Sequence, residues 1–227
     1  MKAHTDKTYD AQLDDLRNKL LTLGGKVETE IANSMRALTE RDSKLAEMVV
    51  SQDREVNRLE IEIDEACRRL LVLRQPAASD LRFITTALKI VVDLERIGDL
   101  AVNIAERAMD LNQAPPLAAY VDMPRLAELA QEQVKKALDS FVRADPDEAQ
   151  EVLAGDDHLD DLFVKIFNEL LAFMMEDSRN IRRATSLVSI CKHLERIGDH
   201  AVNVAEMVIY MVRGTDVRHP RSRVVES

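Results

Sequence analysis

A thirteen-residue segment occurs twice in this chain, and this internal repeat constrains the fold more than any other feature. Residues 94–106 read LERIGDLAVNIAE and residues 194–206 read LERIGDHAVNVAE, an offset of 100 with two differences. Upstream the similarity continues at an offset of 103, where the corresponding pairs are Asp42 and Asp145, Asp53 and Asp156, Val56 and Leu159, Leu59 and Leu162, and Ile63 and Ile166. The repeat indicates two copies of one structural unit.

Apolar residues recur every three or four positions in both copies, which is the spacing of one helix face. The 227 residues include only 6 Gly and 6 Pro, so little of the chain is suited to turns, and long helices are favoured. We predict six helices, at about residues 9–41, 43–74, 79–112, 124–144, 146–176 and 178–214.

Local signals mark several helix ends. Pro76 ends the second helix, and Ser79 or Asp80 is the predicted N-cap of the third. Asp145 followed by Pro146 predicts the start of the fifth helix, and Gly214 the end of the sixth.

Short connections within each copy require antiparallel neighbours. The predicted fold is all-α, with two tandem antiparallel three-helix bundles related by an approximate internal two-fold axis, placed end to end or side by side. The predicted boundaries are a first bundle at 1–112, a linker at 113–123, a second bundle at 124–214 and a loose C-terminal tail at 215–227.

The net charge of -10 argues against non-specific nucleic-acid binding, which needs a basic surface, and favours cations or basic partners. The N-terminal sequence has no apolar signal-peptide region, and no apolar stretch is long enough for a membrane span. We therefore expect a cytoplasmic protein without direct membrane insertion. Cys67 and Cys191 lie alone in apolar helical stretches and are predicted to be buried thiols.

Each repeated segment contains a polar stripe opposite its apolar face. At about 100° per residue, the stripe residues of one copy fall within an arc of about 80°. They are Glu95, Asp99, Asn103 and Glu106 in the first copy, and Glu195, Asp199, Asn203 and Glu206 in the second. Gly98 and Gly198 lie inside these helices, where they permit close approach of a neighbouring helix.

The helical hairpins bring further oxygen ligands to these stripes. The turn at Pro76 is midway between Asp53 and Asp99, and midway between Asn57 and Glu95. In the second copy the turn near 177 places Asp156 beside Asp199 and Asp160 beside Glu195. The same register therefore occurs twice.

The sequence predicts two metal sites on this basis. The predicted ligands are Asp53, Asn57, Glu95 and Asp99 in the first copy, and Asp156, Asp160, Glu195 and Asp199 in the second. Oxygen ligands without Cys or a fixed His suit Mg²⁺, Ca²⁺, Mn²⁺ or ferric iron. A solvated acidic face without metal is the alternative.

No catalytic motif is present: the sequence has no phosphate-binding Gly-rich loop, G-x-S-x-G, H-E-x-x-H or C-x-x-C. It also lacks the Glu-x-x-His pair of di-iron carboxylate proteins. We therefore predict a protein that is not an enzyme. A ferritin-like carboxylate metalloenzyme and a purely structural bundle are the alternatives.

The doubled LERIGD-x-AVN-x-AE, with the upstream DREVNRLE and DDHLDDLF, resembles the PhoU family of phosphate-signalling regulators over nearly the whole chain. The resemblance implies metal-binding E/D-x-x-x-D motifs and no catalytic activity. It also implies a cytoplasmic adaptor between the phosphate ABC transporter, through its ATPase subunit PstB, and the sensor histidine kinase PhoR. Such an adaptor represses the phosphate-starvation response when phosphate is plentiful. A homodimer is expected.

One position departs from the family pattern. Asn57 stands where the second copy and the family have Asp, and its neutral amide weakens the first site. The sequence therefore predicts unequal occupancy of the two sites.

Overall fold

The computed structural model describes residues 7–115, 122–215 and 217, which form long α-helices and no strand. The six α-helices are α1 (Lys7–Thr39), α2 (Ser43–Arg74), α3 (Ala78–Asn112), α4 (Met123–Arg143), α5 (Pro146–Glu176) and α6 (Ile181–Arg213). A 3₁₀ turn, η2 (Ser178–Asn180), precedes α6. The predicted all-α fold is confirmed.

The helix starts agree with the predicted caps in α5 but not in α3. Asp145 accepts hydrogen bonds from the backbone N–H groups of Asp147 and Glu148, at 2.9 and 3.1 Å. The predicted cap of α3 at Ser79 or Asp80 is wrong, because Ala77 occupies the N-cap without a side-chain hydrogen bond. The helix begins as soon as the turn containing Pro76 ends, which leaves both polar residues inside the first turn.

The C-terminal helix also differs slightly from its prediction. It was expected to begin at Ser178, where the structure has the 3₁₀ turn, and α6 itself begins at Ile181. Gly214 ends α6 as predicted, with a φ of 71° that suits glycine.

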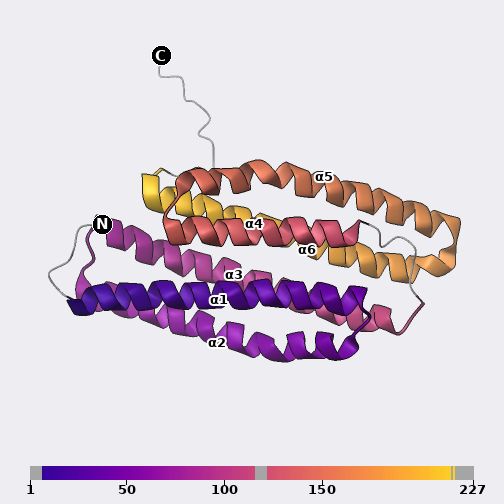
Figure 1. The fold of residues 1–227 in the computed structure, drawn as a ribbon, viewed down its shortest axis with the longest axis horizontal. Helices are drawn as coiled ribbons and strands as arrows, with labels where there is room; N and C mark the ends of the chain where they lie inside the picture. Colours follow the sequence, from indigo (N-terminus) through magenta and orange to yellow (C-terminus); the bar gives the residue numbers. More distant parts are fainter. Residues whose placement is uncertain (1–6, 116–121, 216, 218–227) are drawn as a thin grey trace, which may run out of the picture.

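Helices α1–α3 form one antiparallel bundle and α4–α6 form a second bundle, which lies alongside the first (Figure 1). The bundles meet where α3 packs against α6 and α1 against α4. The side-by-side arrangement is therefore observed. An approximate two-fold axis relates the halves.

Close contacts and a polar link hold the two bundles together. A Cβ atom on Gly24 of α1 would lie 2.6 Å from Leu138 Cδ1 of α4, so glycine allows the two helices to approach. Between α3 and α6, His200 Nδ1 lies 2.8 Å from Asp93 Oδ1, and Asn203 Nδ2 donates to the same oxygen at 3.2 Å. Both α6 residues thus face the seam between the bundles.

The two cysteines, Cys67 and Cys191, are buried and unpaired, as predicted, and burial raises the pKa of each thiol to about 12. Residues 116–121 of the predicted linker, and 216 and 218–227 of the predicted tail, lie outside the described residues. Within the described ranges, every helix is too polar or too short to traverse a bilayer.

Candidate metal centre

The first acidic site lies at Gly98 of α3, where α1 and α2 both approach. A Cβ atom at this position would lie 3.2 Å from Val56 Cγ1, 3.4 Å from Glu30 Oε2 and 3.7 Å from Asp53 Oδ1. Glycine therefore leaves room for carboxylate oxygens from two other helices above the α3 backbone, which confirms the predicted close approach.

Glu30, on α1, is a member of this site that the sequence analysis missed. The residue is only 4% exposed, and its Oε2 is buried without a hydrogen-bond partner among the described residues, as is Asp53 Oδ1. Burial, followed by the charge of Asp53, raises the pKa of Glu30 to about 8. Two buried carboxylate oxygens without a donor are atoms that a cation would satisfy.

In the first site Asp53 and Asp99 interact, as the helical register requires. Burial and then the charge of Asp99 raise the pKa values of both Asp53 and Glu95. Asn57 Nδ2 donates to Asp53 Oδ2 at 2.8 Å. That hydrogen bond occupies one oxygen of Asp53 and leaves Oδ1 directed toward Gly98.

The second acidic site has the same plan around Gly198 of α6. Here Gln133 of α4 takes the place of Glu30, at the offset of 103, and is 7% exposed. A Cβ atom on Gly198 would lie 2.6 Å from Gln133 Oε1. Neither polar atom of the Gln133 amide makes a hydrogen bond of standard geometry within the described chain. The amide nevertheless lies close enough to Asp156 to lower the pKa of that carboxyl, against the larger rise that burial causes.

The four predicted acidic residues of this second site interact with one another. Burial raises the pKa of Asp156, and the charges of Asp160 and Asp199 add to the shift. Burial followed by the charge of Glu195 raises the pKa values of Asp160 and Asp199. The structure thus brings Asp156 together with Asp199, and Asp160 together with Glu195, as the turn near 177 predicted.

The two sites contain equal numbers of carboxylates and amides. The positions differ, because Glu30 and Asn57 of the first site correspond to Gln133 and Asp160 of the second. The first site has Glu30, Asp53, Glu95 and Asp99 with the amide of Asn57, and the second has Asp156, Asp160, Glu195 and Asp199 with the amide of Gln133. Unequal occupancy was predicted from Asn57 alone. Because Glu30 supplies the carboxylate that Asn57 lacks, that reason no longer separates the sites.

Lys192 is a better reason to expect a difference. Its Nζ lies 2.6 Å from both carboxylate oxygens of Glu195. The equivalent residue of the first copy is Val92, at the offset of 100, and the nearest cation there, Arg96, lies 3.7 Å from Glu95 and Asp99. A bound metal ion must therefore compete with a closer ammonium group at the second site.

In the placement observed, no three Asp, Glu, His or Cys side chains of the described residues converge closely enough to hold one ion. Glu95 and Asp99 are partly exposed, whereas Glu30 is buried. The donor chemistry fits a hard cation, and metal binding at the eight predicted residues stays a prediction.

Comparison with known proteins gives one consistent result. The family model described as the PhoU domain matches residues 20–108 and 123–208, once in each bundle. The chain is 45% identical to the phosphate-specific transport system accessory protein PhoU homolog of Pseudomonas putida, over 95% of this chain and 85% of that protein. It is 35% identical to the PhoU protein of Escherichia coli, over 96% of this chain and 91% of that protein.

Solved structures agree with the sequence matches. The crystal structure of PhoU from Pseudomonas aeruginosa is similar with a TM-score of 0.88 and 44% identity, over 91% of this chain and 100% of that chain. The phosphate transport system regulatory protein PhoU from Streptococcus pneumoniae has a TM-score of 0.85 and 27% identity, over 93% and 100% of the two chains.

Proposed function

Because the chain belongs to the PhoU family, we propose that it is a non-enzymatic regulator of phosphate uptake and phosphate-starvation signalling. The observation that supports this most is the family match in both halves of the chain, which includes both copies of the acidic motif. Relatives that match over at least 95% of this chain are named accessory proteins of the phosphate-specific transport system.

The proposed action is that of an adaptor in the cytoplasm. It links the ATPase subunit of the phosphate transporter, PstB, to the sensor histidine kinase PhoR, and it represses the starvation response when phosphate is plentiful. The acidic surface charge suits partners with basic contact surfaces. We propose that the protein acts as a homodimer.

A hard cation at each acidic site is part of the proposal. Mg²⁺, Ca²⁺, Mn²⁺ or ferric iron would neutralise the clustered carboxylates and join neighbouring helices within each bundle. Glu30 and Asp53 would hold the ion above Gly98, and the acids of α5 and α6 would do so in the second bundle. His200 is bonded to Asp93, so this histidine is directed to the contact between α3 and α6.

Deletion of the gene tests the proposed function. Alkaline phosphatase activity is measured in phosphate-rich medium in the wild-type strain, the deletion strain and a complemented strain. The proposal predicts a strong rise in activity on deletion and its reversal on complementation. Unchanged repression in the deletion strain would contradict the proposal.

A complementing variant with Glu95, Asp99, Glu195 and Asp199 all changed to Ala separates the metal sites from the rest of the protein. If metal at these sites is needed for signalling, this variant accumulates as a folded protein but does not restore repression. Full repression by the variant would show that the adaptor role does not depend on the acidic sites.

A further inference from the structure

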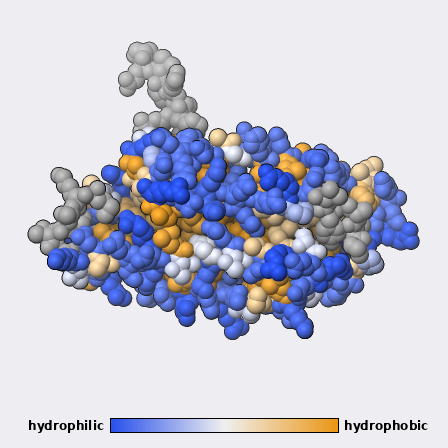
Figure 2. Space-filling view, in the orientation of Figure 1, coloured by the Kyte–Doolittle hydropathy of each residue, from blue (hydrophilic) through white to orange (hydrophobic). Residues whose placement is uncertain are grey.

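Helix α5 has an apolar stripe on its solvent-facing side. Its members recur every three or four positions and are exposed by 53% at Val164, 39% at Phe167, 43% at Leu171 and 81% at Met175. Within the described residues, α5 packs mainly against α4, α6 and the turn η2, and no helix of the other bundle packs extensively against it. Figure 2 shows hydrophobic patches over α5 among hydrophilic residues.

The first bundle provides an internal control for this stripe. At the offset of 103, the equivalent residues of α2 are Ile61, Asp64, Arg68 and Val72. Asp64 and Arg68, which take the places of Phe167 and Leu171, form an ion pair on the surface. The fold therefore accepts charged residues at both central positions. The continuous stripe on α5 is not a requirement of the bundle, and exposed apolar patches of this kind mark interaction sites.

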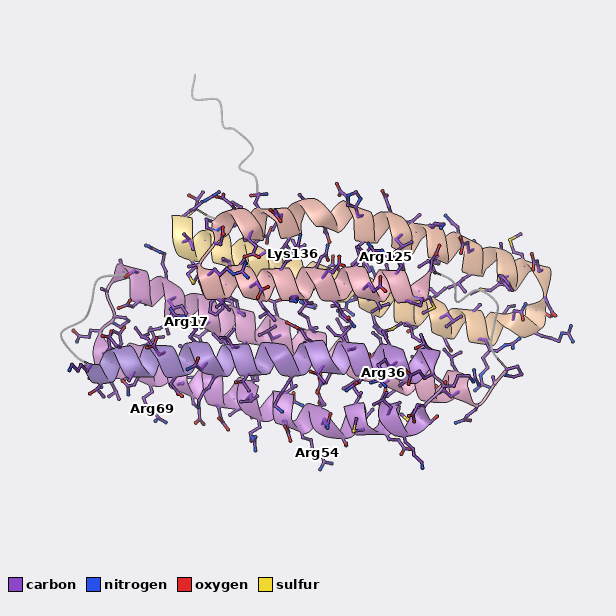
Figure 3. All side chains as sticks on the ribbon, in the orientation of Figure 1. Arg17, Arg36, Arg54, Arg69, Arg125 and Lys136 are labelled. Atoms are coloured by element: carbon purple, nitrogen blue, oxygen red, sulfur yellow. The ribbon has the colours of Figure 1, made fainter. Side chains whose placement is uncertain are left out.

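The charges around the stripe select among possible occupants. Apart from Lys165, all the charged residues of α5 are acidic, and Lys165 is paired with Asp122 and lies near Glu169. The basic residues labelled in Figure 3 belong to α1, α2 and α4. On the elements that pack against α5, Lys192 is paired with Glu195 and Arg179 with Asp177. A second α5 helix or an anionic membrane would be repelled, whereas a segment with Lys or Arg beside an apolar face would be attracted.

The stripe also reaches the second acidic site. The rings of Phe163 and Phe167 lie 6.3 Å apart between centroids, and Lys192 Nζ lies 5.5 Å from the centroid of Phe163. The same ammonium group contacts Glu195. An occupant of the stripe would therefore lie next to that site.

We infer that the α5 stripe, Val164, Phe167, Leu171 and Met175, is the docking surface for a basic amphipathic helix of a partner protein. The apolar face of the partner helix packs on the stripe, and its basic flanks face the acidic residues of α5. The inference rests on the proposed function for the nature of the partner, which would belong to the phosphate-signalling apparatus.

The test uses the full-length protein and variants copied from α2. Phe167→Asp/Leu171→Arg introduces the residues found at 64 and 68, and these are expected to form the same ion pair. Met175→Glu changes the most exposed stripe residue, so it still tests the stripe if the double variant does not fold. Ile61→Glu, at a residue of α2 that is 56% exposed, is the matched control outside the stripe.

The probe is a helical peptide of about 18 residues, made of leucine and lysine with leucine at every third or fourth position. Binding is measured by calorimetry at physiological salt, and a peptide of the same composition with shuffled leucines is the control. We expect the wild type and Ile61→Glu to bind the amphipathic peptide in preference to the shuffled one. The two stripe variants should bind it at least tenfold more weakly.

Several results would overturn the inference. These are no preference for the amphipathic peptide, an equal loss of binding in Ile61→Glu, or unchanged binding in both stripe variants. A wild-type dimer that the stripe variants dissociate in sedimentation experiments would identify a second copy as the occupant instead. Binding to phosphatidylglycerol vesicles that the variants lose would identify a membrane.

Replacing the chromosomal gene with each variant distinguishes a failure of this inference from a failure of the proposed function. The stripe variants should raise alkaline phosphatase in phosphate-rich medium, and Ile61→Glu should not. If deletion of the whole gene has no effect on the enzyme level, the proposed function fails, while the peptide measurement still decides whether the surface exists. If deletion raises the level and the stripe variants repress normally, the docking surface alone is rejected.

Discussion

Glu30 of α1 and Asp53 of α2 each bury one carboxylate oxygen above Gly98 of α3, and neither oxygen has a hydrogen-bond partner among the described residues. In the absence of a cation this arrangement is electrostatically costly, as the raised pKa values of both residues indicate. The pair therefore makes the stability of the metal-free protein depend on pH.

The first prediction concerns that dependence. The pKa of Glu30 rises from 4.5 to about 8 in the folded protein, so its contribution to stability is fully present below pH 4.5 and is lost as the pH rises to about 8. In EDTA the free energy of unfolding should fall by on the order of 4 kcal/mol over this range. Glu30→Gln should remove most of the fall, as measured by urea unfolding at several pH values.

The reciprocal change is the control for this experiment. Gln133→Glu places a carboxyl group at the equivalent buried position above Gly198 and should add a pH dependence of the same sign. Identical pH profiles for the wild type and both variants would show that neither position matters.

The second prediction concerns the exchanged amide and carboxylate. Glu30→Gln should weaken Mn²⁺ binding at the first site by about tenfold or more, because a charged ligand is lost. Adding Asn57→Asp should restore most of the affinity, since the donor set then equals that of the second site. Calorimetry in a Glu195→Ala/Asp199→Ala background isolates the first site. If the double change does not restore binding, the two positions are not equivalent.

The third prediction concerns Lys192. Removing its ammonium group frees Glu195, so Lys192→Ala should strengthen Mn²⁺ binding at the second site by about threefold to tenfold. The measurement is made in a Glu95→Ala/Asp99→Ala background. Weaker binding in Lys192→Ala would mean that the lysine supports the site rather than competing for it.

The fourth prediction uses the adjacent glycines of α1. A Cβ atom at Gly25 would meet nothing within 4 Å, whereas one at Gly24 would lie 2.6 Å from Leu138 Cδ1. Gly25→Ala should therefore stabilise the protein by about 0.5 to 1 kcal/mol through helix propensity. Gly24→Ala should lose this gain, because the Leu138 side chain of α4 must shift to admit the methyl group. Thermal unfolding of the two variants compares them, and equal effects would count against the close α1–α4 contact.

The fifth prediction concerns the link between the bundles. His200→Leu introduces the residue found at position 100 of the first copy and removes a hydrogen-bond partner of the buried Asp93. The expected loss is about 1 to 3 kcal/mol in the free energy of unfolding, measured with urea. Unchanged stability would indicate that this polar contact does not hold α3 against α6.

Sequence reasoning predicted the fold and the register of the acidic residues for identifiable reasons. The repeat and the caps at Asp145 and Gly214 are local signals, and the hairpin register follows from the turns at Pro76 and near 177. These features predicted six helices and the pairing of Asp53 with Asp99. The cap of α3 was misplaced because Ser79 and Asp80 have cap chemistry but lie after the helix has begun.

Glu30 and Gln133 were missed because neither belongs to an E/D-x-x-x-D motif, and they differ between the copies. A signal was present in each case. Both are polar residues within the buried faces of their helices, and they align with each other at the offset of 103. The packing of α3 on α6 also lay beyond the sequence pattern, because a bundle helix has several faces and periodicity does not say which of them meets the other bundle.

The most direct test of the two cation sites is an anomalous difference map from crystals of the full-length protein grown with Mn²⁺. We predict one manganese peak bounded by Glu30, Asp53, Glu95 and Asp99, and a second bounded by Asp156, Asp160, Glu195 and Asp199. Bound manganese at other positions, with no peak above either glycine, would contradict the account.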